Sequence, residues 1–194
     1  MTQQLSFSGL DPESPPTDRL FLGIFPDAVA AAQIKQVGQR LRESHGLHGH
    51  LLATERLHVT LHHIGDYAGF PTDVSNRVQA AAATVKMPPF EITFDRAGSF
   101  SGRDRNLPFV LRGGDGLNAL LAFQRQVFDA LKLVNVVRRA EPNFTPHITL
   151  LYDDRNVAEL PVEPVRWTAR EFVLIHSLLG QTRHIPRARW PLGH

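Results

Sequence analysis

The sequence predicts an α+β fold made of two pseudo-symmetric lobes, each with the order β-α-β-β. The mostly antiparallel sheets of these lobes face a central groove and carry their helices outside. Strand-like and helix-like patterns occur in the same order in both halves of the chain, which indicates an internal repeat. The spacing agrees, because Leu22 and His58 lie 36 positions apart while Val110 and His147 lie 37 apart. Each half then adds one further strand pattern.

The elements of the first half follow from their residue patterns. A Phe- and Leu-rich segment opens this half as a buried strand, and the pair Pro26-Asp27 starts an amphipathic helix that stops at Gly46. A second, Ala-rich helix ends at a Pro-Pro pair, and alternating apolar residues mark the remaining strands. In chain order we expect strand 19–25, helix 27–46, a strand in the second half of 50–66, helix 72–86 and strand 90–94.

The second half repeats this order around the clearest amphipathic helix of the chain. Leu and Phe residues recur at helical spacing over residues 116–134, so one face of this helix should be buried. The flanking segments are short, apolar and bounded by turn residues, as strands are. In chain order we expect strand 107–113, helix 116–134 and strands within 144–153 and 170–180.

Length and composition predict a single bilobal domain over residues 19–194, with lobes at roughly 19–100 and 101–192. Residues 1–18 are rich in Pro, Ser and acidic residues and predict a disordered tail. The chain of 194 residues contains no Cys, which excludes disulfides, thiolate metal sites and a cysteine nucleophile. No apolar run approaches the ~18 residues of a membrane helix. The N-terminus has no signal-peptide pattern, so we expect a cytoplasmic protein.

Basic residues concentrate in the second half of the chain. Residues 1–95 carry 7 basic and 10 acidic residues, whereas residues 96–194 carry 14 and 9. Of the 21 basic residues 18 are Arg, whose planar fork grips phosphate at two points. A basic second half is therefore a candidate surface for an anionic ligand.

The same tetrapeptide pattern, His-x-Thr-Leu, occurs at matching places in the two halves. It reads His58-Val-Thr60-Leu in the first half and His147-Ile-Thr149-Leu in the second. Side chains alternate along a strand, so His and Thr of each copy point to one face and the apolar residues to the other. If a two-fold relates the halves, two His and two Thr converge across one groove.

Two facing imidazoles suit an in-line displacement at phosphorus. One imidazole accepts a proton from the attacking oxygen, and the other donates a proton to the leaving oxygen. An ordinary pKa near ~6.5 allows both duties around neutral pH. The Thr hydroxyls can bind the non-bridging oxygens, where negative charge develops. This chemistry requires no metal and no cofactor.

These motifs, with the RLFLGIF opening and the two-lobed order, resemble the 2H phosphoesterase superfamily. The sequence is most similar to its bacterial 2′-5′ RNA ligase-like members, the RNA 2′,3′-cyclic phosphodiesterases. The resemblance implies metal-independent opening of an RNA 2′,3′-cyclic phosphate to a 2′-phosphate, and in some members reversible, ATP-independent 2′-5′ joining of tRNA halves. It also implies that His58 is the general acid, His147 the general base, and Thr60 and Thr149 the phosphate ligands.

The sequence departs from that family at one position. In many members an Arg that contacts phosphate follows the second motif's Thr by three residues, and here Tyr152 stands at that position. The candidate replacement cations are Arg183 near the C-terminus and Arg103 and Arg105 in a turn.

Three further residues are candidate substrate contacts. His62 shares the face of His58 by strand alternation, and His176 and Ser177 lie in the last long strand. A metal site on His58, His62 and Asp66 is disfavoured, because this histidine spacing suits a helix whereas the pattern is that of a strand.

Three functions remain open from the sequence. The first is an enzyme acting on cyclic phosphates at RNA ends, such as tRNA fragments. The second is the same chemistry on a small-molecule cyclic phosphate. The third is a non-catalytic binder of RNA ends, which would not need two titrating groups. The expected protein is a monomer without a membrane partner.

Overall fold

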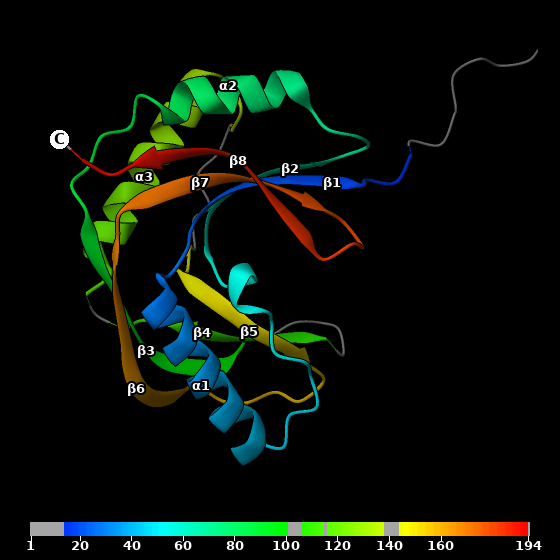
Figure 1. Cartoon of the computed structure of the whole chain (residues 1–194), viewed down its shortest axis with the longest axis vertical. Coiled ribbons are helices and arrows are strands. Elements are labelled where there is room, and N and C mark those ends of the chain that lie inside the picture. The colour runs from blue at the N-terminus through cyan, green and yellow to red at the C-terminus, as the bar shows by residue number, and fades with distance from the viewer. Residues whose placement is uncertain (1–13, 101–105, 115, 138–143, 194) are drawn as a thin grey trace, which may run out of the picture.

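The computed structural model describes residues 14–100, 106–114, 116–137 and 144–193. Within these residues eight strands form one sheet, flanked by three α-helices and one short 3₁₀ helix (Figure 1). The elements are β1 (Asp18–Ile24), α1 (Ala28–Ser44), η1 (Thr54–Arg56), β2 (Val59–Tyr67), α2 (Thr72–Ala82), β3 (Phe90–Ser99), β4 (Leu107–Arg112), α3 (Asn118–Leu133), β5 (His147–Asp153), β6 (Leu160–Ala169), β7 (Glu171–Leu178) and β8 (Arg183–Pro191).

The predicted α+β class is confirmed, with antiparallel pairing between neighbouring strands and helices on the outside. The strand order is β6-β3-β4-β5-β2-β1-β7-β8, which divides into two groups of four. These groups are the β5 half-sheet (β6, β3, β4, β5) and the β2 half-sheet (β2, β1, β7, β8). They join where Val59 of β2 pairs with Ile148 of β5.

Each half-sheet draws on both halves of the sequence. Strand β3 pairs with β4 and β6, and strand β7 pairs with β1 and β8. Helix α1 packs on β5 and β6 of the β5 half-sheet, whereas α3 packs on α2 and contacts a strand of each half-sheet, β2 and β3 (Figure 1). The expected lobes at 19–100 and 101–192 therefore do not coincide with the half-sheets, because β3 lies beside strands of the second lobe and β7, with β8 beyond it, lies beside β1 of the first.

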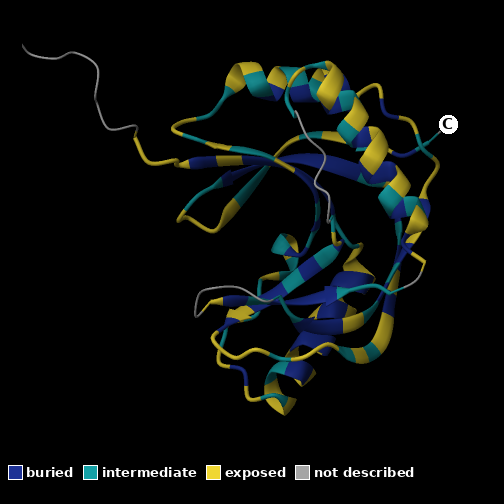
Figure 2. Ribbon diagram, turned by 180° about the vertical axis from the view of Figure 1, so that it is seen from behind, coloured by how far each residue is buried: buried dark blue, intermediate teal, exposed yellow. Residues whose placement is uncertain are grey.

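The helices form where the sequence predicts them. The Asp27 carboxylate caps α1 by accepting a hydrogen bond of 2.8 Å from the Ala30 N–H. Helix α2 ends at Ala82, short of the predicted 86, in a tighter turn where the Thr84 N–H donates to the Ala81 carbonyl oxygen, and Met87 then pairs with Gly193 as an isolated bridge. Helix α3 buries one apolar face in the core, where each large side chain contributes about 1.5–3 kcal/mol. That face carries Leu120, Phe123, Val127 and Leu131, and Figure 2 shows the buried faces of the elements turned inward.

Strands β6 and β8 were not predicted from the sequence. They are the two outermost strands of the sheet, and both contain Pro and charged residues. An edge strand leaves one row of backbone groups unpaired, so it tolerates Pro and shows only weak apolar alternation. Their patterns were therefore too polar to indicate strands.

The described chain begins inside the region expected to be disordered. Residues 1–13 of that tail lie outside the described residues, but β1 already starts at Asp18 and the Thr17 N–H donates to the Tyr67 carbonyl oxygen at 2.9 Å. None of the helices in the described ranges is long and apolar enough to cross a membrane.

Candidate active site

The junction between the two half-sheets determines which side chains face outward. Val59 and Ile148 are paired across it, and both side chains are fully buried. Because side chains alternate along a strand, the residues on either side of Val59 and Ile148 point to the opposite face of the sheet. These neighbours are the His and Thr residues of the two repeated motifs.

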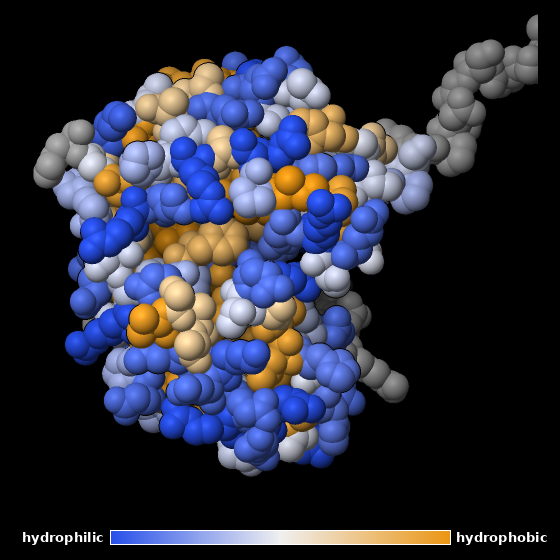
Figure 3. Space-filling model, in the orientation of Figure 1, coloured by the Kyte–Doolittle hydropathy of each residue, from blue (hydrophilic) through white to orange (hydrophobic). Residues whose placement is uncertain are grey.

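The structure brings His58, Thr60, His147 and Thr149 to one cavity of about 580 Å³. The antiparallel pairing places His58 opposite Thr149 and Thr60 opposite His147. The four side chains are thus related by a local two-fold axis through the junction. Figure 3 shows the surface indented between the upper and lower halves of the molecule.

Both imidazoles are anchored in the same way. His58 Nδ1 lies 2.7 Å from the Arg56 carbonyl oxygen, and His147 Nδ1 lies 2.8 Å from the Thr145 carbonyl oxygen. A carbonyl oxygen only accepts, so Nδ1 carries the hydrogen in both rings. Nε2 is then the nitrogen of each ring that is left to take up or release a proton.

Aromatic rings surround the two imidazoles. Phe21 stacks on His58 with ring centroids 4.7 Å apart, and His184 meets His58 edge-on at 5.4 Å. Phe100 meets His147 edge-on at 4.7 Å. These contacts restrict the orientation of both catalytic candidates and reduce their access to water.

Burial lowers the pKa of both histidines. The pKa of His58 falls to about 4, because the ring is buried and the positive charges of His184, His147 and Arg56 oppose its protonation. Burial also lowers the pKa of His147, and the Arg112 guanidinium acts in the same direction. Both imidazoles are therefore harder to protonate than a free histidine.

His62 does not share the face of His58 and Thr60, contrary to the strand-alternation prediction. The register against β1 slips between the pairs Leu22–His62 and Gly23–Thr60, which marks a β-bulge in β2. The bulge turns His62 into the core, where its Nε2 lies 3.1 Å from the Gln124 carbonyl oxygen of α3. His63 lines the cavity in its place.

His176 also lies away from the catalytic cavity. It is buried, its Nε2 lies within hydrogen-bonding distance of the Asp18 carboxylate, and its ring packs on Phe70 with centroids 4.8 Å apart. Ser177, the next residue, does line the cavity. Alternation along β7 explains this difference, since only one of two successive side chains can face the cavity.

The remaining candidates divide into three groups. Tyr152 lines the catalytic cavity, whereas Arg183 lines a second cavity beside it. Arg103 and Arg105 lie outside the described residues. Across the ranges that the structure describes, no group of three or more His, Asp and Glu side chains could hold a metal ion.

The sequence missed Arg56 and His184, which both line the catalytic cavity. Arg56 lies two residues before His58, and this proximity to the motif could have indicated that it lines the cavity. His184 lies at the start of β8, an edge strand without a clear pattern.

Comparison with known proteins finds one matching family and several similar proteins. A family model described as the 2′-5′ RNA ligase superfamily matches residues 25–181. The chain is 26% identical over 157 residues to the RNA 2′,3′-cyclic phosphodiesterase of Escherichia coli (strain K12), covering 74% of this chain and 80% of that protein. The crystal structure of apo E. coli LigT covers 93% of this chain and 100% of its own, with a TM-score of 0.69 at 25% identity. The LigT complex with 3′-AMP gives 0.68 at 26% identity over the same shares.

Proposed function

The chain belongs to the 2′-5′ RNA ligase superfamily, and from this premise we propose that it opens RNA 2′,3′-cyclic phosphate ends to 2′-phosphates. The observation that carries the proposal is the two-fold arrangement at the strand junction. Two imidazoles, each anchored through Nδ1, and two Thr side chains line one cavity. Acid and base can therefore act from opposite sides of one phosphorus atom.

In this reaction water attacks phosphorus opposite the ribose 3′-oxygen. His147 Nε2 accepts the proton of the attacking water, and His58 Nε2 donates a proton to the 3′-oxygen as its bond to phosphorus breaks. The product carries its phosphate on the 2′-oxygen. Thr60 and Thr149 donate hydrogen bonds to the two non-bridging oxygens, where charge develops in the transition state. The 5′-hydroxyl of a second RNA in place of water gives a 2′-5′ bond by the same route.

We expect this activity to persist in EDTA, because the two imidazoles supply both proton transfers and the two Thr hydroxyls bind the oxygens on which charge develops. The assay incubates the protein with a short RNA that ends in a 2′,3′-cyclic phosphate and with a cyclic mononucleotide. The product isomer is identified by nuclear magnetic resonance or chromatography. Activity that disappears in EDTA and returns with added metal, or a 3′-phosphate product, would contradict the proposal.

The pH profile should be a bell displaced to the acid side. The active form needs one protonated and one neutral imidazole, and this form is most populated between the two apparent pKa values of the pair. Because burial lowers both pKa values, kcat/KM, which reports the free enzyme, should peak below ~6.5.

A bound phosphate anion favours protonated imidazoles, so the profile of kcat should lie at higher pH than that of kcat/KM. Rates are measured between pH 4 and 9 at constant ionic strength. A kcat/KM maximum above pH 7, or a flat profile, would show that the two histidines do not act as this pair.

A further inference from the structure

We propose that the cavity beside the catalytic one binds the nucleotide that precedes the cyclic phosphate, so that the preferred substrate is an RNA of at least two nucleotides. This inference deepens the proposed function and rests on it. The second cavity has a volume of about 380 Å³, within the range of small-molecule sites. Its lining combines apolar side chains with several charged ones, among them Arg56 and Arg183.

The two cavities are continuous along one wall. Arg56, Thr182 and His184 line both of them. A ligand whose cyclic phosphate lies between His58 and His147 can therefore extend past these three residues without leaving the protein surface. An RNA strand continues from its terminal nucleoside through a 5′ phosphodiester, which is the group that would reach this wall.

Arg56 is the charged group at that wall. The ion pairs among the described residues do not include Arg56. Its Nε is also buried without a hydrogen-bond partner in that part of the chain. A buried donor on an unpaired cation is costly unless an anion binds it. A phosphodiester can satisfy it through the bidentate geometry that a guanidinium favours.

His184 provides a second, independent observation at the same place. Its Nδ1 is buried and has no hydrogen-bond partner within the described ranges. The wall shared by the two cavities thus carries two unsatisfied polar atoms from different elements, η1 and β8. Both can contact one phosphodiester that lies across the wall.

The rest of the second cavity offers an apolar surface for a nucleobase and further cations for the RNA backbone. Phe25, Ile175 and Pro186 supply an apolar surface, and Arg183 adds a second cation that forms no ion pair among the described residues. Arg189 is paired with Glu171, and the Glu55 carboxylate also lines the cavity. The phosphodiester should therefore lie at the Arg56 end, with the base against the apolar side.

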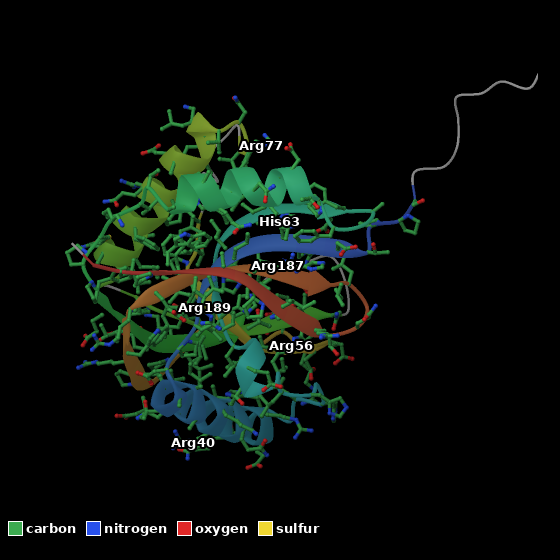
Figure 4. All side chains as sticks on the ribbon, turned by 45° about the horizontal axis from the view of Figure 1, so that its top comes forward. Arg40, Arg56, His63, Arg77, Arg187 and Arg189 are labelled. Carbon is green, nitrogen blue, oxygen red and sulfur yellow. The ribbon has the colours of Figure 1, made fainter. Side chains whose placement is uncertain are left out.

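The backbone of this wall is itself held in an unusual conformation. Thr182, in the turn between β7 and β8, has a φ of 51°, which is rare for a β-branched residue. Such strain persists where the surrounding structure requires it, often beside a binding site. Figure 4 shows Arg56 beside the hairpin of β7 and β8, with Arg187 and Arg189 on β8.

The test compares kcat/KM for adenosine 2′,3′-cyclic phosphate with that for a dinucleotide ending in the same cyclic phosphate. We expect the wild-type protein to prefer the dinucleotide by roughly tenfold or more, the range of one or two charge-assisted hydrogen bonds. Arg56→Gln and Arg183→Gln should each reduce this ratio toward one, mainly by raising KM for the dinucleotide. Arg40→Gln, on α1 and far from both cavities, is the matched control and should leave the ratio unchanged.

Two results would overturn the inference. One is equal kcat/KM for both substrates in the wild-type protein. The other is an equal loss on both substrates in Arg56→Gln with the ratio preserved, which would assign Arg56 to the catalytic phosphate alone. Melting temperatures within a few degrees of wild type show that the variants fold.

Failure of the proposed function gives a different result. If the wild-type protein turns over neither substrate, the hydrolytic proposal fails, and affinity then tests the second cavity by itself. The dinucleotide 2′-phosphate should still bind more tightly than adenosine 2′-phosphate, and Arg56→Gln should remove that difference. Equal affinities in the wild-type protein would show that the second cavity does not bind the preceding nucleotide.

Discussion

Alanine at either His58 or His147 is expected to lower kcat at least ~10²-fold, because each substitution removes one of the two proton transfers. The losses should not add. Once one transfer is missing, the other His has no concerted partner, so the double variant should lose little more than either single variant. Steady-state rates on a cyclic-phosphate RNA measure these effects.

Stability should change little in these variants, since both rings face a cavity rather than the core. His50→Ala is a suitable control, because His50 is an exposed histidine outside the cavity and its replacement should leave kcat unchanged. If either cavity variant kept more than about a tenth of wild-type kcat with normal folding, that His would not be the acid or the base.

A substrate with sulfur in place of the 3′-oxygen should restore most of the activity of His58→Ala and none of that of His147→Ala. A thiolate leaves without protonation, so the general acid becomes dispensable while the base that activates water does not. The comparison needs kcat for oxygen and sulfur substrates with wild type and with both variants.

The low pKa of His58 makes the reversed assignment, with His58 as the general base, the main alternative that this experiment tests. Burial opposes the proton that a general acid needs, and it does so strongly at His58, where it lowers the pKa to about 4. Binding of the phosphate anion must therefore restore that proton before His58 can act as the acid. Rescue of His147→Ala alone would show that the roles are reversed and that His58 is the base.

The shared face of His and Thr within each motif could be predicted from sequence because its geometry is local, whereas the meeting of the two motifs at one cavity depends on the distant pairing of Val59 with Ile148. Two copies of His-x-Thr, each on a strand, must place His and Thr on one face. Alternation of side chains failed at His62 because the register of β2 shifts there. Such a bulge depends on the pairing with β1 and cannot be recognised in the residue pattern of β2 alone.

The second cavity could not be predicted in this way. Its wall includes His184 and Arg189 from β8, an edge strand whose Pro and Arg residues hide its alternation. The exchange of β3 and β7 between the half-sheets was equally hidden, because a strand pattern predicts a buried face without specifying the neighbouring strand.

That exchange has a consequence for how the chain is made. Strand β1 lies between β2 and β7, and Ile24 precedes Glu171 by 147 positions. The pairing of β1 with β7 therefore cannot form until β7 has been synthesised. The pair that joins the half-sheets, Val59 and Ile148, is separated by 89 positions. Such distant contacts form slowly, and domains generally fold as units as they leave the ribosome. A nascent chain that contains only the first motif therefore has two of the four motif residues and no complete half-sheet, and the cavity that they line can form only after β5 and β7 have been synthesised.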